Sequence, residues 1–111
     1  MMYETWCGKI DEEAYEREKD GYSNTGICLF PKDVLKNCFE FSSSDWFTIV
    51  LNAEEMFGNS TWMDWGSFFC RGDYETMKSF LNIIKADEST MEKFEALPKE
   101  GDYGFVFIED Y

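Results

Sequence analysis

Hydrophobic and polar positions follow two different periods along this chain of 111 residues, and together they predict both strands and helices. Short, dense apolar runs predict strands at 3–10, 26–30, 46–51 and 103–108. The run at 46–51 is rich in aromatic and β-branched residues. The run at 103–108 is apolar on both faces, which is typical of a strand at the centre of a sheet.

Other segments have apolar residues three or four positions apart and predict helices at 32–39, 60–70 and 74–84. A polar helix is predicted at 11–20, ending at Gly21. Asp73 is suited to cap the helix at 74–84. Ser89 and Glu92 form a capping box that predicts a last short helix, ending before Pro98. Turn residues at 21–26, 42–44 and 58–59 separate these elements.

Strands at both ends with helices between them predict an α+β fold, in which several short helices pack on a small, mainly antiparallel sheet. The length fits a single compact domain, 1–111. The first residues lack the basic and apolar regions of a signal peptide, and no apolar run approaches the ~20 residues of a membrane span. We therefore expect a cytoplasmic protein that does not bind membranes.

Charge sets the chain apart from an average domain. It has 23 acidic and 10 basic residues, a formal net charge of -13, and no histidine. Because 19% of its residues are aromatic, it is expected to fold rather than to be a disordered acidic tail. Its net charge exceeds the magnitude of about 2–8 that solubility requires of a small domain. Such a surface repels nucleic acid and attracts basic proteins.

The residues do not favour an enzyme. Without histidine there is no His-dependent triad, and the many carboxylate pairs match no diagnostic motif. No calcium-binding loop or phosphate-binding glycine loop occurs.

The four cysteines, at positions 7, 28, 38 and 70, include no Cys-x-x-Cys, so we expect reduced, packed thiols and no metal or cofactor. Arg71-Gly72-Asp73 matches a cell-attachment tripeptide, but a turn and a helix cap explain it better.

The predicted helix at 11–20 provides the first candidate site. Glu12, Glu16 and Asp20 recur at i, i+4 and i+8, beside Glu13. On a helix they form a row of carboxylates about 6 Å apart, close to the spacing of phosphates along a nucleic-acid strand. The row predicts a surface that binds a groove lined by Lys and Arg. The alternative is a solvated helix face without a partner.

Aromatic residues provide the second candidate site. Trp62 and Trp65 share the helical spacing of 60–70 with Phe68 and Phe69, which predicts one aromatic face. This face belongs either to the core or to a surface that binds a partner, where tryptophan is favoured.

In size, charge and lack of motifs, the chain is similar to the counter-defence proteins of phages, such as anti-CRISPR and anti-restriction proteins. That resemblance implies an inhibitor that mimics nucleic acid in the basic groove of a nuclease or CRISPR effector. Two alternatives stay open: an immunity protein that neutralises a basic bacterial toxin, and a non-enzymatic acidic adaptor. In each case the expected partner is a protein and not nucleic acid.

Overall fold

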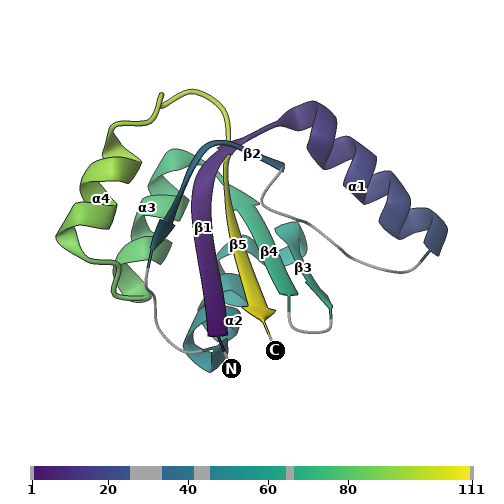
Figure 1. Ribbon diagram of the computed structural model, residues 1–111, viewed down its shortest axis with the longest axis horizontal. Coiled ribbons are helices and arrows are strands. Elements are labelled where there is room, and N and C mark those ends of the chain that lie inside the picture. Colours follow the sequence, from purple (N-terminus) through teal and green to yellow (C-terminus); the bar gives the residue numbers. More distant parts are fainter. Residues whose placement is uncertain (1, 26–33, 42–45, 65–66, 111) are drawn as a thin grey trace.

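The computed structural model describes residues 2–25, 34–41, 46–64 and 67–110. Within these ranges, helices and strands follow one another in a mixed order (Figure 1). The elements are β1 (Met2–Ile10), α1 (Glu12–Thr25), β2 (Leu35–Phe41), α2 (Trp46–Phe57), the short 3₁₀ helix η2 (Gly58–Ser60), β3 (Thr61–Asp64), β4 (Ser67–Gly72), α3 (Tyr74–Ile83), α4 (Glu88–Glu95) and β5 (Tyr103–Asp110).

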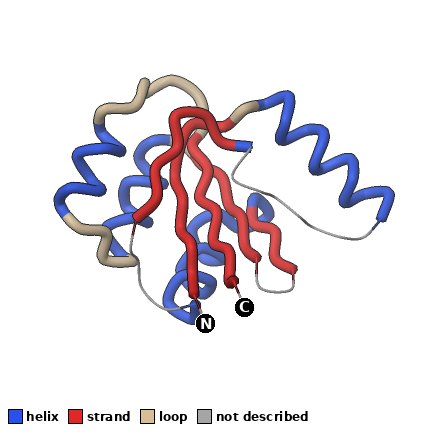
Figure 2. Tube along the Cα trace, viewed as in Figure 1, coloured by secondary structure: helices blue, strands red, loops and turns tan. Residues whose placement is uncertain are grey.

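The described strands form one sheet in the order β2-β1-β5-β4-β3, and each neighbouring pair is antiparallel. The first and last strands of the chain are therefore hydrogen-bonded to each other. The predicted α+β class with an antiparallel sheet is confirmed (Figure 2). The central position predicted for 103–108 is confirmed as well, because β5 lies between β1 and β4.

Side chains of β5 alternate between two separate hydrophobic clusters. Tyr103, Phe105 and Phe107 belong to the larger cluster, which α2, α3 and α4 cover. Val106 belongs to the smaller cluster on the other face, with Ala14 and Tyr15 of α1. In Figure 1, α2 and α3 lie behind the strands, whereas α1 leaves the top of β1 and runs outward past β4 and β3. One face of the sheet thus carries three helices and the other carries α1.

Gly8 and Gly104 allow close packing at the centre of the sheet. A Cβ at Gly8 would lie 2.8 Å from the backbone Cα of Cys38, where the register between β1 and β2 shifts. A Cβ at Gly104 would lie 2.5 Å from a methyl group of Leu35 and 2.7 Å from one of Ile10. The contact at Gly8 is with backbone, so that position requires glycine, whereas a side chain at Gly104 would require the ends of Leu35 and Ile10 to shift.

Three predicted elements are wrong, in each case because packing overrides the local pattern. The predicted strand at 46–51 is helix α2, since Ile49, Ala53 and Phe57 are buried at i, i+4 and i+8. The helix predicted at 32–39 is wrong where the structure describes it, because β2 begins at Leu35, pairs with β1 and places Phe39 and Phe41 against the core.

The predicted helix at 60–70 is the third error, because β3 and β4 pair with each other as antiparallel strands. Phe68 and Phe69 are both buried, but they belong to different clusters on opposite faces of the sheet. Neighbouring residues point to opposite faces in a strand and not in a helix. The aromatic helical face therefore does not exist.

The remaining predicted helices and strands that the structure describes are present with shifted bounds, but the turn predicted at 21–26 is wrong, because 21–25 belong to a helix. The helix predicted at 11–20 is α1, which continues through Gly21 to Thr25, because glycine weakens a helix without forbidding it. Asp73 caps α3 as predicted. The N-cap of α4 is Asp87 and not Ser89, since its carboxylate accepts the backbone N–H of Thr90. The predicted strand at 26–30 and break at 42–44 lie outside the described residues.

Candidate functional site

Helix α1 begins where the chain leaves the sheet after β1. The Asp11 carboxylate accepts the backbone N–H of Ala14 at 3.3 Å, and the Asp11 carbonyl accepts that of Tyr15 at 2.9 Å. Glu12 and Glu13 follow in the first turn, where negative charge complements the positive end of the helix dipole. The acidic residues thus help to start the helix that carries them.

The side chains of α1 divide between a packed face and an exposed face. Each helical residue turns the chain by about 100°, which places Ala14 and Tyr15 on one side. Both are buried against the sheet. Glu13, Glu16 and Asp20 fall on the opposite side, and all three are exposed. The structure therefore brings together three of the predicted carboxylates on one outward face.

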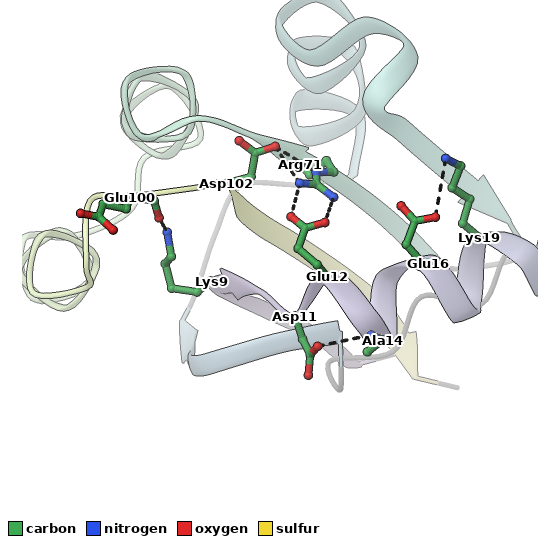
Figure 3. Close-up of polar contacts among 9 residues, drawn as sticks. All are labelled: Lys9, Asp11, Glu12, Ala14, Glu16, Lys19, Arg71, Glu100 and Asp102. Carbon is green, nitrogen blue, oxygen red and sulfur yellow. Dashed lines mark hydrogen bonds and ion pairs between the residues drawn. The ribbon is translucent and has the colours of Figure 1, made fainter.

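Glu12 has a different environment from the rest of the predicted row. Its two carboxylate oxygens accept hydrogen bonds from Nη2 of Arg71 at 2.6 Å and from Nη1 at 3.1 Å (Figure 3). Arg71 also donates from Nε to Asp102 Oδ2 at 3.0 Å, and its guanidinium lies 4.4 Å from the Tyr15 ring centroid. Arg71 of β4 thus links Glu12 of α1 to Asp102, which lies just before β5.

The electrostatics of this cluster favour the charged forms. The hydrogen bond from Arg71 lowers the pKa of Glu12 below its usual value. Burial works against the charge of Arg71, but the hydrogen bonds to Glu12 and Asp102 outweigh it and raise the pKa of Arg71. Burial raises the pKa of the Tyr15 hydroxyl. The cluster therefore places Glu12 and Asp102 around one partly buried arginine.

The two predicted tryptophan sites are not brought into one helical face. Trp62 lies in β3, in register with Phe69 of β4. Trp65 lies outside the described residues. Their role in binding a partner stays a prediction, and it no longer has a helical face to support it.

Sequence reasoning missed two features of the surface. One is the cluster around Arg71, whose partners Glu12 and Asp102 lie far away in the sequence. The other is the exposed pair Phe47 and Leu51 of α2, which the strand predicted at 46–51 does not anticipate. The spacing of Ile49, Ala53 and Phe57 was the signal that could have identified the helix and hence its exposed side.

In the described parts of the chain, no group of three or more Cys, Asp or Glu side chains is placed to hold a metal ion. Cys7, Cys38 and Cys70 are free thiols, and burial raises the pKa of Cys7 and Cys70. Among the helices described here, none is both long enough and apolar enough to cross a membrane.

No protein-family profile matches the sequence, no curated protein is similar to it, and no solved structure matches the fold.

Proposed function

We propose that this protein is a small acidic inhibitor that binds the basic groove of a nucleic-acid-binding protein and excludes the nucleic acid. The observation that carries the proposal is the exposed face of α1. Glu13, Glu16 and Asp20 lie opposite the packed face of a helix that runs outward past the sheet (Figure 1). A cationic groove could therefore contact these carboxylates without disturbing the core.

The spacing of the carboxylates supports mimicry of a phosphate backbone. Glu16 and Asp20 are four residues apart, which corresponds to a rise of about 6 Å along the helix. Phosphates on one strand of duplex DNA rise about 3.4 Å per nucleotide and are further separated by the turn of the duplex. The two spacings are similar enough for one Lys or Arg of the partner to face each carboxylate.

The proposed mechanism is competition for the groove. A net charge of -13 attracts a basic surface at long range, and this attraction speeds association. Binding is then expected to weaken as salt is added, because added ions screen the charges. The same charge keeps the inhibitor itself away from DNA and RNA.

Charge reversal on the exposed face of α1 tests the proposal. The variant carries Glu13→Lys, Glu16→Lys and Asp20→Lys, and leaves Glu12 and its ion pair with Arg71 intact. The matched control carries Glu75→Lys, Glu88→Lys and Glu92→Lys, which are exposed acids on α3 and α4. Both variants have the same net charge, so a difference between them reports position.

The measurement is inhibition of a panel of purified nucleases and CRISPR effector complexes, with cleavage of labelled nucleic acid as the readout. We expect the wild-type chain to inhibit a basic member of the panel. The α1 variant should lose at least tenfold in potency, and the control should lose much less, since like-charge contacts at an interface cost several kcal/mol. Equal losses in both variants, or no inhibition by the wild type, would contradict the proposal.

A further inference from the structure

A second surface, on helix α2, exposes large apolar side chains. The exposed fractions of Phe47 and Leu51 are 74% and 62%. They are four residues apart, so they are neighbours on one side of the helix. Single exposed apolar residues are common on protein surfaces, whereas contiguous exposed apolar patches mark interaction sites, and this pair is contiguous.

The fold does not need this pair. Helix α2 packs on the sheet through Ile49, Ala53 and Phe57, which are all buried. Phe47 and Leu51 lie on roughly the opposite side of the helix, because each residue turns the chain by about 100°. They leave water only if something outside the described core covers them.

Acidic residues continue the same exposed side. Glu54 and Glu55 follow in the next turn of α2, and both are exposed. The sequence has no basic residue between Lys36 and Arg71, so α2 and the strand that follows it, β3, supply no lysine or arginine. We define the α2 face as Phe47, Leu51, Glu54 and Glu55; it is apolar at one end and negative at the other.

This combination restricts what can cover the α2 face. A second copy of the chain would bring another acidic surface and a further charge of -13. Nucleic acid and anionic membranes are repelled for the same reason. An apolar stripe flanked by Lys or Arg is complementary to both ends of the face.

We propose that the α2 face is a docking site for a helix of a basic partner protein, with the apolar stripe of that helix on Phe47 and Leu51 and its cations beside Glu54 and Glu55. Helices with apolar residues at i, i+3, i+4 and i+7 bind such surfaces along their length. The inference rests on the proposed function only in taking the partner to be a basic protein. It adds a contact that has apolar as well as charged character.

A synthetic amphipathic peptide tests the site without the natural partner. The probe is a helix-forming peptide of leucine and lysine, with the leucines on one face. The control peptide has glutamine in place of every leucine and therefore keeps the charge. Each is titrated into the ¹⁵N-labelled full chain, and the amide shifts locate the binding site. We expect saturable shifts centred on 47–55 for the leucine peptide and at least tenfold weaker binding for the control peptide.

Matched variants of the protein make the test specific. Phe47→Gln with Leu51→Gln should weaken the leucine peptide at least tenfold, whereas Ile83→Gln should not, although the Ile83 side chain is also 44% exposed. Glu54→Gln with Glu55→Gln should weaken it more than Glu88→Gln with Glu92→Gln. Circular dichroism of each variant confirms that it is folded.

Several outcomes would overturn this inference. One is a set of amide shifts centred on 13–20, and another is an equal loss of peptide binding in the Ile83 variant and in the Phe47/Leu51 variant. A third is a dimer, detected by light scattering, that the Phe47/Leu51 variant dissociates; the occupant of the α2 face would then be a second copy of the chain. Failure of the proposed function has a different signature: no effector is inhibited, while the leucine peptide still binds α2. Conversely, inhibition through α1 with no peptide site on α2 would remove only the inference made here.

Discussion

The guanidinium of Arg71 and the carboxylate of Glu12 meet side by side, with Nη2 2.6 Å from Oε1 and Nη1 3.1 Å from Oε2. Two parallel hydrogen bonds constrain the orientation as well as the distance of the pair. Because Glu12 is in the first turn of α1, the pair helps to set the rotation of the helix about its axis. That rotation is what turns Glu13, Glu16 and Asp20 outward.

Replacement of Arg71 by lysine is expected to loosen α1. Lysine keeps the positive charge but cannot reproduce the planar fork that joins Glu12 to Asp102. We expect a loss of about 1.5–3 kcal/mol in the free energy of unfolding, the range for hydrogen bonds to charged groups. The lower end is favoured because 62% of the Glu12 side chain is exposed. Denaturant unfolding measures the loss.

Hydrogen exchange locates the effect of the same variant. Amides of α1 should exchange faster in Arg71→Lys, whereas those of α3 should change little. Arg17→Lys, an exposed position on α1, serves as the control. If α1 exchanges at the wild-type rate in Arg71→Lys, the ion pair does not anchor the helix.

The pH dependence of the Glu12–Arg71 pair follows from the lowered pKa of Glu12. A carboxylate whose pKa is lower in the folded state stabilises the fold at pH values above its unfolded pKa, about 4.3 for Glu. That contribution is lost as the pH falls through the lowered folded pKa. Titration of the ¹³C-labelled Glu12 carboxylate by NMR should therefore give a midpoint below the usual value. In Arg71→Gln the midpoint should rise; an unchanged midpoint would mean that Arg71 does not cause the shift.

Elements with a strong and unambiguous pattern could be predicted from the sequence. The strand at 103–108 is apolar at every position except Gly104, and only a central strand buries both faces. Asp73 before a helical apolar stripe identifies the start of α3, because its carboxylate accepts the backbone N–H of Thr76 at 2.9 Å. These signals are local, so tertiary contacts only reinforce them.

Some apolar segments fit both the period of a strand and the period of a helix. Their structure could not be predicted, because tertiary contacts decide between the two. The run at 46–51 fits a strand by composition, yet it continues into Ala53 and Phe57 at helical spacing. Phe68 and Phe69 fit a helix by spacing, yet they pack on opposite faces of the sheet. The Arg71–Glu12 pair joins residues 59 positions apart, and no local pattern encodes such a contact.

The two candidate caps of α4 can be separated by alanine substitution. Asp87→Ala removes the acceptor of the Thr90 backbone N–H at 2.8 Å and should lower the melting temperature. Ser89 lies inside the helix and is exposed, so Ser89→Ala should change stability by less than about 0.5 kcal/mol. Thermal unfolding of both variants decides the assignment, and a larger loss for Ser89→Ala would restore the capping box.

Gly104 offers a test of packing in the smaller hydrophobic cluster, which contains the buried residues of α1. A Cβ there would lie 2.5 Å from Leu35 and 2.7 Å from Ile10, both of which are buried. Forcing these side chains apart should cost about 1–3 kcal/mol in Gly104→Ala, as in other overpacked cores. Denaturant midpoints measure the cost. Stability equal to wild type would indicate that the smaller cluster adapts freely.

Cys7 and Cys70 should be unreactive in the folded protein. Each pairs in register with Phe105 of the central strand, from opposite sides, and each has an exposed fraction of 0%. Burial raises the pKa of both thiols, so the reactive thiolate is scarce at neutral pH. Their alkylation therefore requires the sheet to open, and its rate should follow the stability of the fold.

Cys38 provides an internal reference for this measurement, because it lies on the edge strand β2 and is only partly buried. Iodoacetamide labelling, resolved by mass spectrometry of the separate peptides, should modify Cys38 well before Cys7 or Cys70. Destabilising the fold with Gly104→Ala should speed labelling of Cys7 and Cys70 in proportion to the change in the unfolding equilibrium. Labelling of Cys7, Cys38 and Cys70 at one rate in the native protein would show that the sheet around Phe105 is open to solvent.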